Sequence, residues 1–550
     1  METPRKILIA SMLLVGYLLF WNWQHDYGAN ATSQQAARIA PTTSAIASTS
    51  DLPQIHTKDT STTLPVAVTP TMSTPSESID VSTDLMKITI SRKGGDLINL
   101  GLSQYPDQTG STQPFQLLSE SNKMVFVAES GLIGPDGPDA SAGGRPLYQT
   151  SQNNYQLVTG QNQLDVVLST DYQGVHIEKI YHFQRGSYLI GLQYKVVNTS
   201  QKTWAGAMFG QLKRDDSGDP SAHAGMKLST FLGAAWWTSD KPYNKLALKS
   251  VSKSPMQLSE TGGWIALVQH YFVTAWVPDR HTQVTYSTRH QGDFNYVSIV
   301  EPEISILPNQ QQTLQMNLYA GPKIEKNLTA VSPGLDLTVD YGWLWPIAEF
   351  LFWLLNAIHH VVSNWGWSII LLTLLVKAAF WPLSAASYRS MAQMRKLAPE
   401  MARMKEQYGD DRQKLSSAMM EFYRKEKINP LGGCLPMLVQ MPVFIALYWT
   451  LMESVQLRQA GFIFWIHDLS DMDHYFILPL LMGISMFVQQ SLNPPPPDPM
   501  QAKMMKLMPA IFTVFFLFFP SGLVLYWLVS NLISIAQQWL ITKRIEAAAR

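Results

Sequence analysis

A lysine stands inside an apolar segment of the chain, in the stretch SIILLTLLVKAAFWPLS at residues 368–384. A charged side chain near the middle of a bilayer costs on the order of 2.5–3.5 kcal/mol on insertion scales. Lys377 follows Thr373 by four residues and precedes Ser384 by seven, so the three share one helical face. The lysine either extends its stem to the cytoplasmic headgroups or serves a polar site inside a helix bundle.

Polar side chains also recur on the last apolar segment, residues 521–541. Their steps of three and four place them on one helical face: Trp527, Ser530 or Asn531, Ser534 and Gln538. Gln440 adds an amide to the apolar segment 435–455. Hydrogen bonding between neighbouring helices is one explanation of such residues, and a polar lining around Lys377 is the other.

The apolar segments contain no carboxylate near their centres that could pair with Lys377. Their one carboxylate, Glu453, stands at the outer end of its segment. A proton-coupled transporter usually carries a relay of carboxylates, so that class of protein is disfavoured. A cation that faces the bundle without a partner needs water. Together with the short segments 475–492 and 507–519, this predicts a hydrated groove that opens to the cytoplasm and to lipid.

The first part of the chain is predicted to be an anchor followed by a tether. Residues 1–26 combine a basic start, an apolar run and the aromatic exit Trp21-Asn22-Trp23, which favours a retained signal-anchor span. Ala29-Asn30-Ala31 resembles a cleavage site, so a cleaved signal peptide is the alternative. Residues 27–84 are rich in Ser, Thr and Pro without apolar periodicity, and they predict a disordered periplasmic linker.

Residues 85–325 are predicted to form a large antiparallel β-sandwich. Alternating runs such as QLDVVLST and YLIGLQYKVVN recur between Gly, Asn, Asp and Pro, which is typical of antiparallel strands. Histidines and carboxylates occur here without a catalytic spacing. A structural or docking domain is therefore favoured over a domain that acts on carbohydrate.

Residues 326–362 are predicted to form a connector and an amphipathic helix that lies in the membrane interface. The polar face of this helix contains Glu349, Asn356, His360 and Ser363. The opposite face contains Phe350, Leu354, Ala357 and Val361. The candidate interfacial residues are Trp343, Trp345 and Glu349.

Residues 363–550 are predicted to form a helical membrane core. Its five apolar segments run over 363–383, 435–455, 475–492, 507–519 and 521–541. The loop Arg389–Lys427 carries ten Lys and Arg residues and is expected in the cytoplasm. That placement predicts six spans in total, both termini in the cytoplasm and the β domain outside. Methionines at helical spacing within 385–430 predict a cytoplasmic helical hairpin, which either packs through them or presents them to a partner.

Several long motifs resemble the bacterial YidC family of membrane protein insertases, which is related to the mitochondrial Oxa and chloroplast Alb insertases. They are TVDYGWLWPI, NWGWSIILLTLLVK, INPLGGCLPMLVQMPVFIALYWTL, LRQAGFIFWIHDLS and FPSGLVLYWLVSNLISIAQQ. The resemblance spans essentially the full chain and is densest over 335–545. It implies the long Gram-negative form of the family, in the inner membrane, with a periplasmic β-supersandwich domain and five core spans around a hydrophilic groove.

The resemblance also implies roles for individual residues. The groove cation falls on Lys377, its polar partner on Thr373 and an aromatic contact site for clients on Trp527. The family usually has Arg at the first of these positions and often Tyr at the last, so the charge is kept here but the guanidinium fork is lost. Gln440, Ser530, Asn531 and Ser534 are expected to complete the groove. Met441, Phe444 and Tyr526 are expected to be its apolar client contacts.

The expected activity is partitioning of a client between water and lipid, not bond chemistry, so no enzyme activity, cofactor or metal is predicted. Acidic residues of the client are attracted to Lys377, and the polar lining lowers the desolvation cost of its hydrophilic segment. The expected partners are nascent inner-membrane proteins, the Sec translocon, the ribosome near the cytoplasmic loops and the bilayer, without sequence-specific nucleic acid. The alternatives are a small-solute transporter, for which no inverted repeat is visible, and a membrane-anchored domain that acts on carbohydrate.

Overall fold

The computed structural model describes residues 51–53, 78–141, 143–222, 230–408, 411–426, 435–493 and 499–547. The predicted anchor 1–26 and almost all of the predicted linker 27–84 lie outside these ranges. The elements below belong to one compact unit, which comprises residues 52–59 and 69–550.

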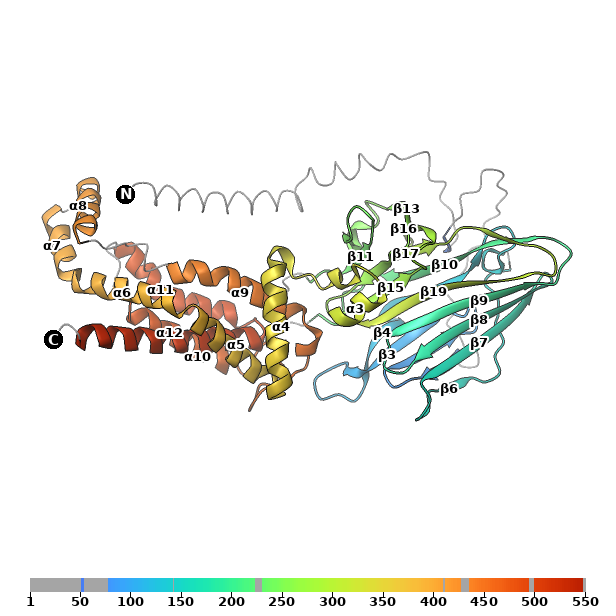
Figure 1. The fold of residues 1–550 in the computed structure, drawn as a ribbon, viewed down its shortest axis with the longest axis horizontal. Coiled ribbons are helices and arrows are strands. Elements are labelled where there is room, and N and C mark those ends of the chain that lie inside the picture. The colour runs from blue at the N-terminus through green and yellow to red at the C-terminus, as the bar shows by residue number, and fades with distance from the viewer. Residues whose placement is uncertain are drawn as a thin grey trace. The chain divides into compact units, whose positions relative to one another are not determined.

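The strands form two sheets that share one apolar core (Figure 1). The 11-stranded sheet contains β1 (Ser78–Ser82), β2 (Met86–Ser91), β3 (Leu97–Pro106), β4 (Pro114–Ser121), β5 (Met124–Ile133), β6 (Asn154–Gln156), β10 (Trp204–Asp215), β13 (Gln257–Thr261), β16 (Gln283–Gln291), β17 (Phe294–Val300) and β18 (Ile304–Ile306). The eight-stranded sheet contains β7 (Gln163–Tyr172), β8 (Val175–Gln184), β9 (Leu189–Asn198), β11 (Gly233–Trp236), β12 (Asn244–Ala247), β14 (Ile265–Val268), β15 (Phe272–Val277) and β19 (Gln311–Pro322). Short 3-10 turns follow β5 (η2, Pro138–Ala140) and β12 (η3, Leu248–Ser250).

Alternation of apolar and polar residues explains these strands. In β8, Ile177, Lys179 and Tyr181 are fully buried, while Glu178 and Ile180 between them are partly exposed, as expected for a strand that covers a core with one face. The pairings are antiparallel, apart from β1 with β6, which is parallel. Sequence periodicity therefore predicted the strand-rich character of this region correctly.

The β region begins earlier than predicted. Strand β1 lies inside the predicted linker 27–84, and its register with β2 pairs Ser78 with Ser91 and Ser82 with Lys87. Ile79 and Val81 are buried. Five residues are too few to reveal a period, and the partner strand supplies the backbone hydrogen bonds that order them.

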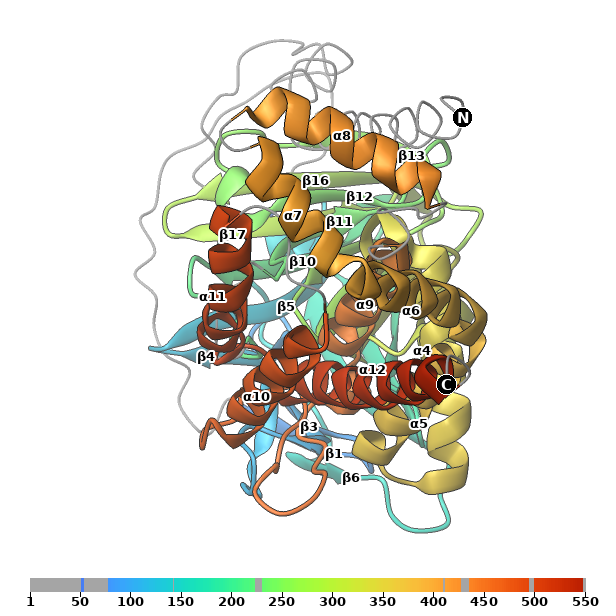
Figure 2. The ribbon, with the colours of Figure 1, turned by 90° about the vertical axis from the view of Figure 1, so that its left-hand side faces the viewer.

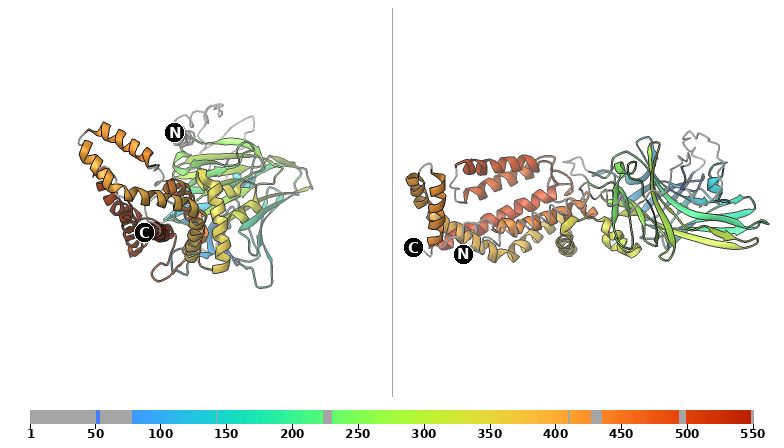
Figure 3. Two further views of the ribbon diagram at one scale, coloured as in Figure 1. Left: turned by 60° about the vertical axis from the view of Figure 1, so that its left-hand side comes forward. Right: turned by 90° about the horizontal axis from the view of Figure 1, so that it is seen from above.

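Between the sheets and the helical region lies a connector. It contains α3 (Glu325–Val331), two short 3-10 turns, η4 (Leu335–Thr338) and η5 (Gly342–Leu344), and the helix α4 (Trp345–Val362). Helix α4 runs across the other helices instead of along them (Figures 1 and 3), and it packs against α5 and α9.

Helix α4 packs against the protein through residues outside both predicted faces. Its buried residues are Ala348, Leu351 and Leu355. Phe350 and Val361, expected on a common apolar face, are exposed, and so is Glu349. The helix therefore packs through a narrow stripe and leaves both aromatic and polar side chains exposed. Most of its residues are apolar, so the positions of the neighbouring helices α5 and α9 determine which of them are buried.

The helical C-terminal region contains eight helices in its described part: α5 (Trp365–Ala379), α6 (Trp381–Lys396), α7 (Ala398–Tyr408), α8 (Arg412–Lys425), α9 (Leu435–Glu453), α10 (Ile477–Ser491), α11 (Pro499–Phe516) and α12 (Ser521–Ala547). A short 3-10 turn, η7 (Val455–Leu457), follows α9. Figure 2 shows α6 leading from α5 towards α7 and α8. The helices α7 and α8 contact each other, and the hydroxyl of Tyr423 lies 3.8 Å from the sulfur of Met401.

One described helix, α12, is long and apolar enough to cross a membrane, and α5 with α6 counts as a second only if the bent pair is one span. The predicted count of six spans thus stays a prediction. The predicted segment 363–383 is interrupted, because α5 ends at Ala379 and α6 departs at an angle of 66°. Pro382 lies directly after this break, where a proline is tolerated in the first turn of a helix but not in its interior. Helix α11 starts at Pro499, ahead of the predicted apolar segment 507–519.

Candidate functional site

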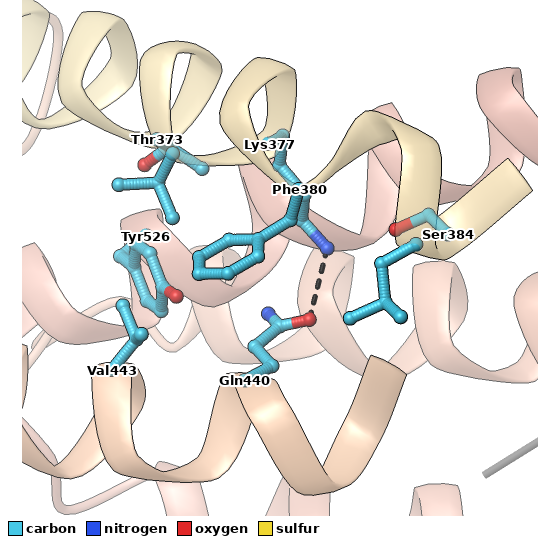
Figure 4. A pocket seen from close by; sticks show the side chains of 9 residues that line it. Thr373, Lys377, Phe380, Ser384, Gln440, Val443 and Tyr526 are labelled. Atoms are coloured by element: carbon cyan, nitrogen blue, oxygen red, sulfur yellow. Dashed lines mark hydrogen bonds between the residues drawn. The ribbon is translucent and has the colours of Figure 1, made fainter. Parts of the chain in front are cut away.

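The Lys377 ammonium is held between three helices. Its Nζ donates hydrogen bonds to Oε1 of Gln440 on α9, at 3.0 Å, and to Oγ of Ser534 on α12, at 2.8 Å. The amide of Gln440 in turn donates to Oγ of Ser530, at 2.8 Å. Figure 4 shows Lys377 and Gln440 pointing toward each other. Among the residues that the structure describes, no carboxylate forms an ion pair with Lys377.

Helix α5 sets the position of Lys377. The side chain of Asn364 caps the helix by accepting a hydrogen bond from the Trp367 backbone N–H, at 3.1 Å, which satisfies one of the free donors of the first turn. Thr373 is fully buried on the same face as Lys377. Its hydroxyl donates to the backbone oxygen of Ile369, at 2.7 Å, so it lines the site without bonding the lysine.

Helix α12 divides its polar stripe between two neighbours. Ser530 and Ser534 face the lysine cluster, and the hydroxyl of Ser534 also donates to the backbone oxygen of Ser530, at 2.8 Å. Asn531 faces α10, where its amide donates to Oγ of Ser485 at 3.0 Å. Sequence spacing left Ser530 and Asn531 as alternatives, and the structure places only Ser530 in the lysine cluster. Ser485 was missed, and its only signal was a small polar residue in an apolar segment.

A small cavity of about 20 Å³ lies beside the lysine (Figure 4). Its lining residues are Thr373, Val376, Lys377, Phe380, Leu383, Ser384, Gln440, Val443 and Tyr526. That volume is room for about one water molecule. Lys377 is 8% exposed. The site is therefore much narrower in this structure than the predicted hydrated groove, because side chains of three helices close around the ammonium.

Aromatic side chains gather next to the polar cluster. The ring of Trp527 lies 4.6 Å from that of Phe444 and 5.0 Å from that of Phe516. Tyr526 is stacked on Phe444 at 6.3 Å. Phe516, on α11, was not predicted. Met441 is 44% exposed, so its side chain lies largely outside this aromatic group.

The candidate interfacial residues stand apart from the lysine cluster, on the connector and α4. Trp343 and Trp345 are 50% and 59% exposed, and Glu349 is exposed as well. Exposed tryptophans at one end of a helix are typical of a membrane–water interface. They do not line the cavity beside Lys377.

Two families match this chain. Residues 357–548 match the family described as 60Kd inner membrane protein, and residues 78–354 match the family described as YidC periplasmic domain. Two curated relatives, from Pseudomonas aeruginosa and Pseudomonas fluorescens, are each named membrane protein insertase YidC. Each is 50% identical to this chain and matches it over 100% of its length, with 100% and 99% of the relative covered. The chain belongs to the YidC family.

Membership in the YidC family identifies the β-rich region as the periplasmic domain of an inner-membrane protein. The helical region is the C-terminal part of that protein. The YidC relatives are named as insertases, not as enzymes. Among solved structures, an active YidC insertase crystal structure is 17% identical with a TM-score of 0.39, and the match covers 84% of this chain and 92% of that one. A likeness at that level adds no argument to the family assignment.

Proposed function

We propose that this YidC-family chain inserts membrane proteins by drawing a short hydrophilic segment of the client to the Lys377 cluster and releasing the apolar segment to lipid. The observation that supports this best is the bonding of the Lys377 ammonium to two neutral oxygens, one on α9 and one on α12. A buried cation whose hydrogen-bond partners carry no charge keeps its attraction for an incoming carboxylate. A lysine already paired with a carboxylate of the protein would have lost most of that attraction.

The neutral partners of Lys377 also suit the transfer of the client's hydrophilic segment out of water. Gln440, Ser530 and Ser534 can exchange their mutual hydrogen bonds for bonds to a client backbone, which lowers the cost of taking that backbone out of water. The cavity of about 20 Å³ cannot hold a peptide segment. We therefore propose that client entry widens the space between α9 and the helices α5 and α12. Phe444, Tyr526 and Trp527 are proposed to guide the apolar segment outward, with Met441 at the exposed edge.

The proposed topology has six spans with both termini in the cytoplasm. Residues 1–26 form the first span, and α5, α9, α10, α11 and α12 belong to the other five. The ten basic residues of Arg389–Lys427 support the cytoplasmic placement of the hairpin 385–430. Helix α4, with Trp343 and Trp345, is proposed to lie in the periplasmic interface. The Sec translocon and the ribosome are proposed partners, the latter near the basic hairpin.

Charge variants at position 377 test the proposal. Insertion of a client with an acidic leading segment is compared for Lys377→Arg, Lys377→Ala and Lys377→Glu in cells depleted of the native protein. The expected order is arginine near the parent, alanine reduced and glutamate lowest. The same client with its acidic residues neutralised should show a smaller spread, because attraction of the carboxylates is then removed.

Lys543→Glu is the matched control, since Lys543 is an exposed lysine on the same helix as Ser534. It makes the same change of charge outside the cluster and should leave insertion near the parent level. If Lys377→Glu supports insertion of the acidic client as well as Lys377→Arg does, electrostatic attraction is not the mechanism.

A further inference from the structure

The loop between α9 and α10 carries an aromatic tip, residues Gly461–His467, that no part of the insertion mechanism uses. The backbone N–H of Phe462 donates to the oxygen of Ile466, at 2.9 Å, and that of Ile466 donates to the oxygen of Ile463, at 3.2 Å. These bonds close a tight turn. Phe464 stands at its apex and is 82% exposed.

The backbone of Phe464 adopts an uncommon conformation at the apex of the turn. Phe464 has a φ of 53°, in the left-handed region that bulky side chains rarely adopt. Such conformations persist only where the surroundings impose them, and they cluster at functional sites. A large apolar side chain held outward in a strained turn is costly in water, so the tip needs an environment other than water.

The base of the tip is firmly held. The indole N–H of Trp465 donates to Oδ2 of Asp473, at 3.2 Å, and the backbone N–H of Leu469 donates to the oxygen of Ala460, at 2.9 Å. The ring of Phe462 packs edge-on against Trp367 of α5, at 5.5 Å. Phe464 is thus displayed by a structured loop, with its ring stacked on Trp465 at 6.1 Å.

The exposed apolar surface continues from the loop onto α10. Tyr475 and Phe476 are 65% and 39% exposed, and Phe476 also has a positive φ, of 57°. Leu480, Ile484 and Phe487 follow at steps of three and four and are each more than half exposed. In an inner-membrane protein, an outward apolar stripe along a helix faces lipid, and aromatic residues mark the end of such a stripe at the interface.

Contacts of the same loop identify the side of the membrane. The side-chain amide of Gln459 donates to the oxygen of Pro106 on β3, at 3.1 Å. Arg458 lies over the ring of Phe115 on β4, at 5.2 Å. Both strands belong to the periplasmic domain, so the loop lies on the periplasmic side.

We propose that the Phe464 tip inserts into the interfacial region of the periplasmic leaflet, where it continues the lipid-facing stripe of α10. The occupant of this surface is the bilayer and not an acidic or basic protein. Within residues 454–476 the only Lys or Arg is Arg458, which is 9% exposed. The three carboxylates of this range, Asp468, Asp471 and Asp473, are partly or fully buried and accept backbone hydrogen bonds. The contact is therefore apolar and insensitive to salt. It is independent of the Lys377 cluster.

A fluorescent label at the tip tests this placement. The full chain, with Cys434→Ser to remove its one cysteine, receives Phe464→Cys and an environment-sensitive nitrobenzoxadiazole label. It is reconstituted in vesicles of phosphatidylethanolamine and phosphatidylglycerol. Gln312→Cys, at an exposed position of β19, is the aqueous control. Ile484→Cys, on the exposed stripe of α10, is the lipid control.

The expected result is a blue-shifted emission at position 464, several-fold weaker quenching by aqueous iodide than at position 312, and quenching by lipids that carry a nitroxide near the headgroup. Added salt should not change it. Iodide quenching equal to that at position 312 would overturn the proposal, because the tip would lie in water. Protection from both quenchers would also overturn it, because protein would cover the tip. Ile463→Cys, 37% exposed beside the apex, gives the same readout if Phe464→Cys lowers the melting temperature.

Discussion

Lys377 and Lys179 are both buried, and their partners differ in kind. Lys377 donates to side-chain oxygens of two helices, which a client is proposed to replace. Lys179, in the periplasmic domain, donates to the backbone oxygens of Gly94 and Ser130, at 2.9 and 3.0 Å. The second lysine is fully buried, and its partners cannot leave without unfolding the strands. We infer that Lys179 is structural.

Burial lowers the pKa of Lys179 to about 7, an effect that Asp96 partly offsets. Between that value and the ordinary lysine pKa of about 10.4, the unfolded chain binds a proton that the folded chain has released. Stability conferred by this group is therefore lowest at and below neutral pH and rises as the pH increases. Relative to Lys179→Met, the parent should gain about 2–3 kcal/mol of stability between pH 7 and pH 9.

Thermal unfolding of the full chain in detergent, followed by circular dichroism across that pH range, measures this difference. Lys195→Met is the control, because Lys195 lies on the partly exposed face of β9 beside Glu178. Parallel pH profiles for the parent and Lys179→Met would contradict the assignment.

At the scale of elements, the start of α5 depends on a close approach by the loop that follows α9. A Cβ at Gly366 would lie 2.1 Å from Cδ2 of Phe462, so the ring packs directly on the helix backbone. Glycine is required here by the approach of a neighbour, not by its own backbone angles. This contact joins α5 to the base of the aromatic tip.

Gly366→Ala should destabilise the protein by about 1–3 kcal/mol, the usual cost of overpacking, even though alanine is the better helix former. Gly461→Ala, in the same loop, is the control, since its Cβ would meet nothing nearer than 3.6 Å. The two melting temperatures are compared in detergent. Equal melting temperatures for the two variants would show that the Phe462 ring can move aside without loss of stability.

At the scale of the molecule, a buried ion pair joins the periplasmic domain to the helical region. Lys323, directly after β19, donates to Oε2 of Glu453, the last residue of α9, at 2.7 Å. The two side chains are 3% and 8% exposed. His270 adds a hydrogen bond from its Nε2 to the backbone oxygen of Met452, at 2.9 Å. The outer end of the helix that carries Gln440 is therefore held by the domain.

Lys323→Met should cost about 3–5 kcal/mol, because it leaves the Glu453 carboxylate buried without its cation. The double variant Lys323→Met/Glu453→Met should cost less than either single change. Lys245→Met is the control. Lys245 pairs with Asp340 at 2.6 Å, but the two side chains are 38% and 33% exposed. The loss of this exposed ion pair should therefore cost only about 0–1 kcal/mol. Thermal unfolding of the parent, Lys323→Met, Glu453→Met, the double variant and Lys245→Met gives the comparison. A double variant less stable than both single variants would refute the ion-pair account.

Periodicity along the chain was enough to predict the strand-rich region, the apolar helices and the common face of Thr373 and Lys377, because the direction of a side chain about its own axis is set locally. It could not tell Ser530 from Asn531 as the neighbour of the lysine cluster, nor predict the break at Phe380, the small size of the cavity or the buried stripe of α4. Those features depend on which helix lies opposite, and packing between segments far apart in the chain settles that. Strand β1 makes the same point, since its order comes from β2 and not from its own five residues.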